Sequence, residues 1–453
     1  MMSIMAPNQL EFNCWPVGHG LFTSCDVHAD KDHFRMVYDC GSKSDVTKSI
    51  GDLVGRSAHG VDLLVVSHFD ADHVSGIPEL ADRCGIRMAW IPYMSPEMRA
   101  LALLRSAASG EPLPPDDVLA LMIRPRAELE RRNVQVFELG GPPEDGAEGT
   151  RRRPPANEPP EDGRPPKRGR EQEPYLPSSD TLEVTDPRPW PEAMSGSTEF
   201  AAYSSSMVLR IPQRNDERVL DLFTWTRKEF KKGRSIDDII NNVLSKLSRG
   251  GALALTALWD ASANELTTDG VIQLLRRLHS GDASDLKKIY EAAMGANQGS
   301  LFLLAQPYWT HRFEMGALSR HRPHHSICFR VWTEYYRTPV VPNAPAGPDC
   351  LLWTGDAPTA TLNKLVRDAG SPLRSKLGHT DIWQVPHHGS KGSCSCSFCS
   401  LLPTFATRYA SCPAEGQGLH PHDDVVACNK RTAPLTVVTD DDQLPLRRYY
   451  RWW

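Results

Sequence analysis

The sequence contains no apolar run approaching the roughly 18 residues that a membrane-spanning helix needs. Its first residues, MMSIMAPNQLEF, also lack the charged and apolar regions of a secretory signal. Basic residues number 51 and acidic residues 56, so the formal net charge is -5 and no basic field covers the whole chain. These absences predict a cytoplasmic protein that is not membrane-bound and that binds any polyanion through a local site.

Cysteine is also sparse, because 11 residues in 453 fall well below the density of a disulfide scaffold. Three of them, Cys394, Cys396 and Cys399, lie in the string SCSCSFC, and Cys412 and Cys428 follow later. A structural zinc site is one interpretation of this group. The spacing C-x-C-x-x-C lacks a clear partner pair, however, so free or core thiols are the favoured prediction.

Proline is unevenly distributed, since 13 of the 37 prolines lie between Pro142 and Pro191. The same stretch carries the basic strings RRR and PPKRGR. This composition is too polar and too rich in proline to form a hydrophobic core. It therefore predicts a disordered insertion over residues 141–195. Its basic residues could contact nucleic acid or a protein partner, but a solvated linker is the simpler interpretation.

Short apolar segments alternate with turn residues over 10–66, and amphipathic helix patterns lie between them, which predicts an α/β layered fold. SIDDIINNVLSKLSR begins a run of helical patterns that predicts a helical elaboration over 215–296. The predicted organisation is a first half of the domain at 1–140, the disordered insertion at 141–195, a strand plus helical insertion at 196–310, and a second half at 311–453.

The most informative string is LLVVSHFDADHVSGI, in which His68, Asp70, Asp72 and His73 directly follow a buried strand. Side chains at this spacing in a loop after a strand can converge on one point. Single residues of these types often only decorate a loop, but four together predict a dinuclear metal site.

This string resembles the HxHxDH signature of the metallo-β-lactamase fold hydrolases, in the HxDxDH form common in the soluble domain of ComEC-type DNA-uptake proteins. It departs from the commoner form by having Asp70 where a histidine is usual. Further blocks similar to the family pattern occur in the expected order. PVGHGLF and MVYDCGS, which resemble the family's opening glycine-rich hairpin, lie upstream, and LLWTGDA, DIWQVPHHGS and GLHPHDD lie downstream. The resemblance implies an αββα sandwich, here with a disordered and a helical insertion.

The resemblance also implies roles for the metal loop. His68 and Asp70 are expected to bind one metal, and Asp72 and His73 the other. Asp356, in LLWTGDA, is expected to bridge the two ions. Asp72 is expected to act in catalysis as well as in metal binding.

Other roles come from the remaining blocks. Asp39 is expected to hold the metal loop without binding metal, and His420 to be the last metal ligand, with His422 a weaker candidate. Of the PHHGS pair, one histidine is expected to complete a metal shell and the other to protonate the leaving group. Which does which stays open, with His387 assigned as a ligand and His388 as catalytic.

One further ligand is ambiguous. Many relatives carry a histidine on the strand before Gly-Asp, and HHSICFRV offers His324 or His325. ComEC-like members instead often have an Asn-rich turn before a Ser-led strand, which NQGSLFLL resembles. SSMVLRI is a third, poorer match.

The carboxylates make this ligand set harder than an all-histidine zinc site, so two divalent ions are predicted, zinc or manganese, with magnesium or iron as alternatives. The resemblance favours hydrolysis of a phosphodiester, plausibly DNA, by a hydroxide held between the two metals. Candidate contacts to single-stranded DNA are the basic aromatic strings at 225–234 and 447–453. The alternatives are a lactone or thioester hydrolase, or a non-catalytic binding or scaffold protein that kept the fold.

Overall fold

A computed structural model of the chain describes residues 8–29, 32–56, 59–94, 99, 102–103, 113–140, 188–189, 200–205, 220–227, 259–260, 265–266, 300–307, 313–316, 350–394, 396–404, 406–414, 420–430, 433 and 435–452.

Two eight-stranded sheets form the centre of the molecule. The first has the order β13-β18-β1-β2-β3-β4-β5-β6, with parallel pairing from β3 to β6. Its strands are β1 (Asn8–Cys14), β2 (Gly20–Ala29), β3 (Asp32–Ser42), β4 (Val61–Val65), β5 (Ile86–Pro92), β6 (Gln135–Leu139), β13 (Phe313–Gly316) and β18 (Leu446–Trp452).

The second sheet has the order β17-β16-β15-β14-β12-β9-β8-β7, with parallel pairing from β14 to β17. Its strands are β7 (Arg188–Pro189), β8 (Phe200–Ser205), β9 (Leu220–Arg227), β12 (Phe302–Pro307), β14 (Cys350–Trp353), β15 (Thr380–Gln384), β16 (Thr407–Ser411) and β17 (Leu435–Val438). A separate two-stranded pair is formed by β10 (Trp259–Asp260) and β11 (Glu265–Leu266).

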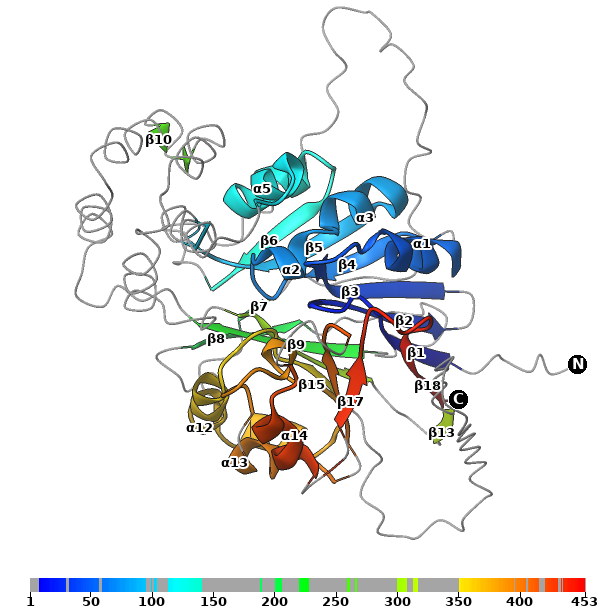
Figure 1. The fold of residues 1–453 in the computed structure, drawn as a ribbon, viewed down its shortest axis with the longest axis vertical. Helices are drawn as coiled ribbons and strands as arrows, with labels where there is room; N and C mark the ends of the chain where they lie inside the picture. The colour runs from blue at the N-terminus through cyan, green and yellow to red at the C-terminus, as the bar shows by residue number, and fades with distance from the viewer. Residues whose placement is uncertain are drawn as a thin grey trace, which may run out of the picture.

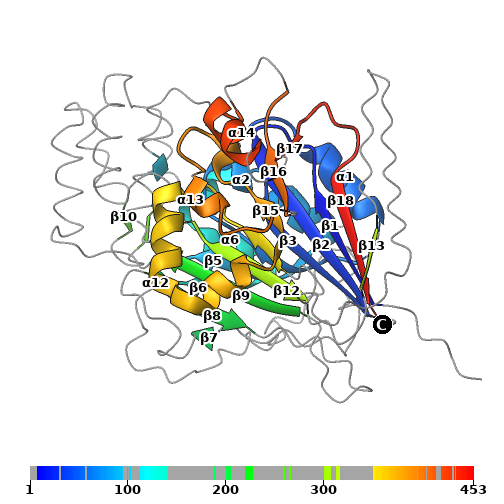
Figure 2. The same ribbon diagram turned by 90° about the horizontal axis from the view of Figure 1, so that it is seen from below.

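Helices cover the outer faces of the two stacked sheets (Figures 1 and 2). On the side of the first sheet lie α1 (Thr47–Arg56), α2 (Ala71–Val74), α3 (Ile77–Cys84), α5 (Asp116–Ile123) and α6 (Pro125–Glu130). On the side of the second lie α12 (Thr359–Leu377), α13 (Cys396–Cys399) and α14 (Asp423–Lys430). The predicted αββα sandwich is therefore confirmed. None of the described helices has both the length and the apolar character that crossing a bilayer requires.

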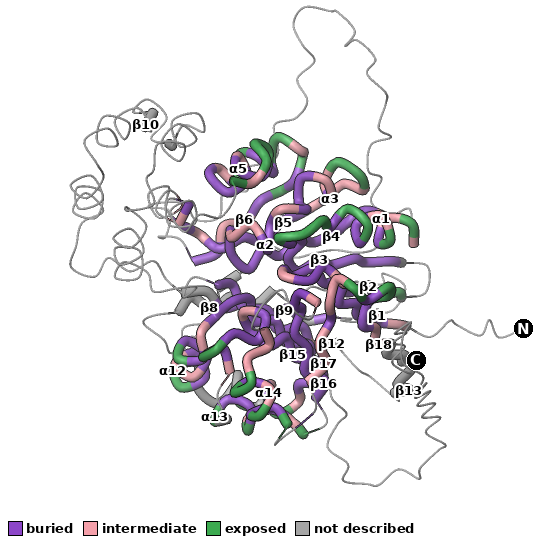
Figure 3. Tube along the Cα trace, viewed as in Figure 1, coloured by how far each residue is buried: buried purple, intermediate pink, exposed green. Residues whose placement is uncertain are grey.

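Three apolar layers hold this arrangement together, and exposed residues gather on the outer helices (Figure 3). The middle layer lies between the sheets and includes Tyr38 and Leu63 from the first and Trp353 from the second. Within β4, neighbouring side chains alternate between layers, since Leu63 faces the other sheet while Leu64 faces the helices. Because β4 is buried on both faces, its sequence is a nearly continuous apolar run.

Some residues lie in other elements than the sequence predicted. Residues 220–227, assigned to the helical elaboration, form β9, which pairs with β8 and β12. Residues 188–189, assigned to the disordered insertion, form β7. Because strand pairing is a long-range contact, local helical patterns nearby could not reveal these strands. Most of 141–195 and of 228–299, and the pair His324 and His325, lie outside the described residues.

Residues 447–452 of the C-terminal string RRYYRWW belong to β18, which pairs with β1 and β13 in the first sheet. The predicted second half of the chain thus contributes β13 and β18 to the sheet built mainly by the predicted first half.

A buried charge network in the first sheet yields a stability prediction. Asp26 Oδ1 accepts hydrogen bonds from Arg35 Nε at 2.6 Å and His33 Nε2 at 2.9 Å, and all three side chains are buried. Burial would raise the pKa of Asp26, but His33 and Arg35 lower it below its usual value. Asp26→Asn should lower the free energy of unfolding by about 3 kcal/mol in a urea titration at neutral pH, because it leaves Arg35 without its buried counter-charge.

The stabilisation from ionised Asp26 should be present above about pH 4, the unfolded pKa, and be lost as the pH falls through the lower folded value. Glu130→Gln is the matched control, because its pair with Arg126 is about half exposed and should change stability by less than about 0.5 kcal/mol. Equal effects of the two variants would contradict the prediction.

Candidate metal centre

The candidate site lies where parallel strands of both sheets end. In the first sheet, Asp39 lies near the end of β3, and His68 follows β4. In the second, Asp356 follows β14, and His388 follows β15. Carboxyl ends of parallel strands share one edge of a sheet, so two stacked sheets bring these loops together.

A first group of ligand atoms comes from His68, His73 and Asp356, which lie within 4.8 Å of one another. Asp356 Oδ1 lies 3.1 Å from His73 Nε2, and Asp356 Oδ2 lies 3.8 Å from His68 Nε2. All three residues are buried. Asp70 lies at the more exposed edge of this group, with Oδ2 3.5 Å from His68 Nε2.

A second group consists of His19, Asp72 and His388. Asp72 Oδ2 lies 3.4 Å from His19 Nε2 and 3.4 Å from His388 Nε2. His388 Nε2 is also 4.0 Å from Asp356 Oδ1. Asp356 therefore lies between the two groups, where a bridging ligand belongs.

The grouping differs from the pairing that the motif resemblance implied, which put Asp72 with His73. The structure joins His73 with His68, and Asp72 with His19. Asp72 and His73 are consecutive on α2, and successive helical side chains point about 100° apart. Asp72 and His73 therefore point to different ligand groups although they are adjacent in sequence.

The donor set fits divalent metal ions. The Nε2 atoms of His68, His73 and His388 are buried and have no hydrogen-bond partner among the described residues. They face the carboxylates of Asp72 and Asp356. Buried imidazole nitrogens and carboxylates that converge in this way can hold zinc or a harder ion such as manganese.

Hydrogen bonds on the opposite ring nitrogen keep these Nε2 atoms available. His73 Nδ1 donates to Asp39 Oδ2 at 2.8 Å, and His388 Nδ1 donates to the Ser411 carbonyl at 2.9 Å. His68 Nδ1 lies 2.8 Å from Ser67 Oγ, and that hydroxyl donates to Asp39 Oδ2 at 2.6 Å. Since Nδ1 carries the proton, Nε2 presents its lone pair to an ion. Asp39 thus orients the loop, as the resemblance implied.

Two glycines let the backbone approach α2 closely. A Cβ on Gly20 would lie 2.8 Å from the Asp72 carbonyl oxygen, and one on Gly41 would lie 2.5 Å from the backbone of His73. Real Cβ atoms do not approach backbone atoms so closely. The β2–β3 hairpin therefore supports the two ligands of α2 only because it carries glycine at these positions.

The PHHGS segment has an uncommon backbone. His387, His388 and Gly389 all have positive φ, at 48°, 53° and 78°, and form one 3-10 turn. This conformation is costly for residues other than glycine and is typical of functional sites. It places buried His388 in the second group, while the side chain of His387 is 43% exposed, with Nε2 3.7 Å from Asp356 Oδ2. These positions favour the buried His388 as the metal ligand and the more exposed His387 as the residue that can meet the substrate. This is the reverse of the predicted roles.

Of the predicted C-terminal histidines, only His420 lies at the site. Its ring centroid is 6.0 Å from that of His19 and 6.3 Å from that of His387. Burial, assisted by the neighbouring histidines, lowers the pKa of His420 to about 4, so the ring is neutral at pH 7. His422 instead faces Asp424, with Nδ1 3.5 Å from Oδ2.

The sequence analysis gives no ligand role to His19, which lies in the string PVGHGLF. Gly18 and Gly20 flank it, and Gly18 has a φ of 68°. A histidine enclosed by two glycines in a tight turn is a weak signal, yet it was available.

The carboxylates stay ionised at neutral pH. Burial would raise the pKa of Asp72, but the neighbouring imidazoles of His19 and His388 hold it well below its usual value. Burial would likewise raise the pKa of Asp356, and His73 and His387 lower it. Burial would lower the pKa of His73, but Asp356 and Asp39 raise it well above its usual value. The site thus strongly favours positive charge beside its carboxylates, which suits cation binding.

Comparison with known proteins finds a family match over part of the chain. Residues 29–177, which contain Asp39 and the loop from His68 to His73, match the model of the metallo-beta-lactamase superfamily. Solved structures similar to the chain include MEM-A1, a subclass B3 metallo-beta-lactamase from a soil metagenome library, at 14% identity over 62% of this chain and 94% of that one, with a TM-score of 0.21. A metallo-beta-lactamase from Cronobacter sakazakii, a mutant in its HARLDQ motif, is similar at 13% identity over 62% of this chain and 94% of that one, with a TM-score of 0.19. No curated protein matches the chain.

Proposed function

We propose that this chain is a metal-dependent hydrolase with a metallo-beta-lactamase superfamily domain, and that it cleaves phosphodiesters with two divalent metal ions. One ion would be held by His68, His73 and Asp356, and the other by His19, Asp72 and His388. Asp70 and His420 lie at the edges of these groups and would complete them.

The observation that carries the proposal is the position of Asp356. Its Oδ1 lies 3.1 Å from a nitrogen of the first group and 4.0 Å from a nitrogen of the second. A single carboxylate within reach of both groups supports two neighbouring ions rather than two independent sites. Ions so bound would activate water and neutralise charge on a phosphoryl oxygen.

The residues of the chain have separate tasks in this proposal. Asp39 and Ser67 keep His73 and His68 in the tautomer that presents Nε2. The buried carboxylates supply negative charge that suits manganese as well as zinc. His387, the exposed member of its pair, would contact the substrate and, when protonated, donate to the leaving oxygen. Partial burial lowers the pKa of His387, so the negative charge of a bound phosphodiester would have to stabilise the protonated ring.

The choice of a phosphodiester rests on the resemblance of HxDxDH and PHHGS to ComEC-type proteins, and DNA in single-stranded form is the proposed substrate. One candidate contact is corrected: Trp225, at the start of the basic aromatic string, is 1% exposed in the core beneath α12 and cannot stack on a base. The side chains of 226–234 and 449–453 lie outside the described residues.

The test combines elemental analysis with hydrolysis of bis-p-nitrophenyl phosphate in manganese, zinc or magnesium. We expect at least two metals per chain and metal-dependent cleavage, followed by cleavage of single-stranded DNA. Metal binding without cleavage of any phosphodiester would reject the proposal in favour of a lactone or thioester hydrolase, to be tested with those substrates. Absence of both metal and turnover would favour a binding or scaffold protein.

A further inference from the structure

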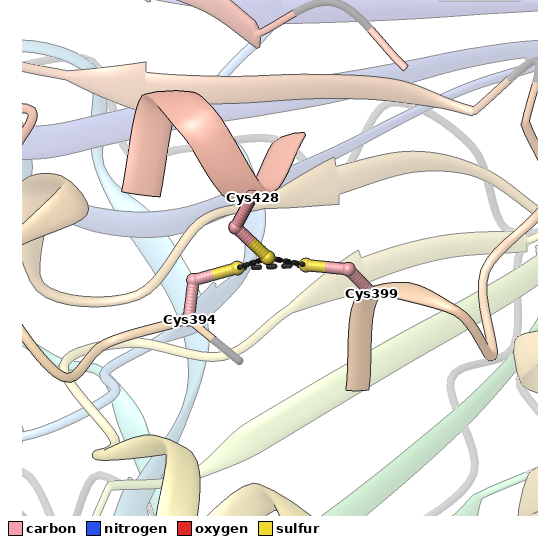
Figure 4. Close-up of side chains that lie close together, drawn as sticks. All are labelled: Cys394, Cys399 and Cys428. Atoms are coloured by element: carbon pink, nitrogen blue, oxygen red, sulfur yellow. Dashed lines mark hydrogen bonds between the residues drawn. The ribbon is translucent and has the colours of Figure 1, made fainter. Parts of the chain in front are cut away.

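Three cysteines lie close together on the helix-covered face of the second sheet (Figure 4). Cys394 ends the loop that carries PHHGS, Cys399 ends α13, and Cys428 lies in α14. Their Sγ atoms are 2.7 Å apart for Cys394 and Cys399, 3.7 Å for Cys394 and Cys428, and 3.6 Å for Cys428 and Cys399. All lie beyond the roughly 2.05 Å of a disulfide bond, so the three are separate thiols.

These separations suit a shared metal ion. Sulfur atoms bound tetrahedrally at about 2.3 Å from zinc are roughly 3.8 Å apart, close to two of the three distances. The third pair, Cys394 and Cys399 at 2.7 Å, is closer than two zinc-bound sulfurs, so these side chains would separate by about 1 Å on binding. The other described cysteines do not form such a group, since Cys14, Cys25 and Cys40 are buried separately as small core residues.

Polar groups around the thiols match a metal–thiolate centre. Asn429 Nδ2 donates to Cys394 Sγ at 3.7 Å, and Asn429 Oδ1 accepts a hydrogen bond from Arg408 at 3.1 Å. The Arg408 guanidinium is fully buried and also donates to the Cys399 carbonyl at 3.1 Å. Zinc with three thiolates carries one net negative charge, which the cation of Arg408 balances inside the core.

We propose that Cys394, Cys399 and Cys428 bind a structural zinc ion, distinct from the two ions of the hydrolytic site. Thiolates are soft ligands that select zinc over manganese or magnesium. The ion would tie the end of the PHHGS loop to α13 and to α14, the helix that follows His420. The ion would then hold in place both the PHHGS loop and the segment that carries His420.

Sequence spacing alone favoured free thiols because C-x-C-x-x-C has no clear partner pair nearby. Cys428 lies 34 residues from Cys394 along the chain, on α14, and only the packing of that helix brings it to the cluster.

The first test counts zinc by elemental analysis in purified wild type, Cys399→Ser, Cys428→Ser and the matched control Cys84→Ser. Cys84 is a half-buried thiol on α3 that donates only to the Leu80 carbonyl. We expect both cluster variants to lose about one zinc per chain and Cys84→Ser to lose none. Unchanged zinc in folded Cys399→Ser and Cys428→Ser would overturn the proposal.

A second test needs no cysteine variant to fold. Chain loaded with cobalt should show intense thiolate-to-metal charge-transfer absorption, and this absorption should persist in Asp356→Ala, which damages only the hydrolytic site. Because that site contains no described thiol, the two centres report separately. Persistence in Asp356→Ala supports the zinc site even if phosphodiester cleavage is never found. Absence of the absorption in both proteins would overturn it.

Discussion

Asp356→Ala should reduce hydrolysis by about 10³-fold or more. The carboxylate lies between the two ligand groups, so its removal weakens binding of both ions, which supply several kcal/mol of transition-state stabilisation. The fold should survive, because Asp356 lies in a loop after β14 and contributes no apolar contact to the core. The measurements are kcat/KM with bis-p-nitrophenyl phosphate, metal content and far-UV circular dichroism.

His73→Ala should have a similar effect, and the double variant should be little worse than either single one, because both residues serve the same centre. Asp52→Ala is the control, since this exposed carboxylate on α1 belongs to neither ligand group. If Asp356→Ala kept more than a tenth of wild-type activity, the assignment of the site would be wrong.

Asp39→Asn should weaken metal binding by about 10- to 100-fold, although Asp39 belongs to neither ligand group. Asn tolerates the left-handed backbone at this position, where φ is 53°, so the substitution tests the hydrogen bonds and not the backbone. Asp39 Oδ1 accepts from the Ser67 amide, which leaves the amide group of the new side chain facing His73 Nδ1. That group would donate to Nδ1 and force the proton onto Nε2, the atom that must bind metal.

The measurement is metal affinity by competition with a chromophoric chelator, together with urea denaturation. Asp26→Asn is a matched control in the same sheet, because it also replaces a buried carboxylate that is hydrogen-bonded to a histidine. It should lower stability while leaving metal affinity within about twofold, given that its network is separate from the strand ends. Comparable metal affinity in Asp39→Asn and wild type would contradict the role of Asp39 in fixing the tautomer.

Local patterns in the sequence predicted the first strands, the metal-binding loop and the class of fold. Alternating apolar segments predicted the strands β1 to β4, and the continuous run at β4 predicted burial on both faces. The acidic and histidine residues after β4 predicted a metal-binding loop, because chain neighbours beyond a strand end must lie close together whatever the rest of the fold does. The order of the motif blocks indicated the αββα sandwich.

Only the tertiary structure decided which residues share a group. Asp72 and His73 are adjacent in sequence, yet the turn of α2 directs them to different groups. His19 joins Asp72, and Cys428 joins Cys394, across long stretches of chain. Such convergence depends on how two sheets stack and how α14 packs on the second, which are contacts between distant segments that no local pattern encodes. For the same reason, the strand at 220–227 was hidden within a region of helical periodicity until its partners β8 and β12 were known.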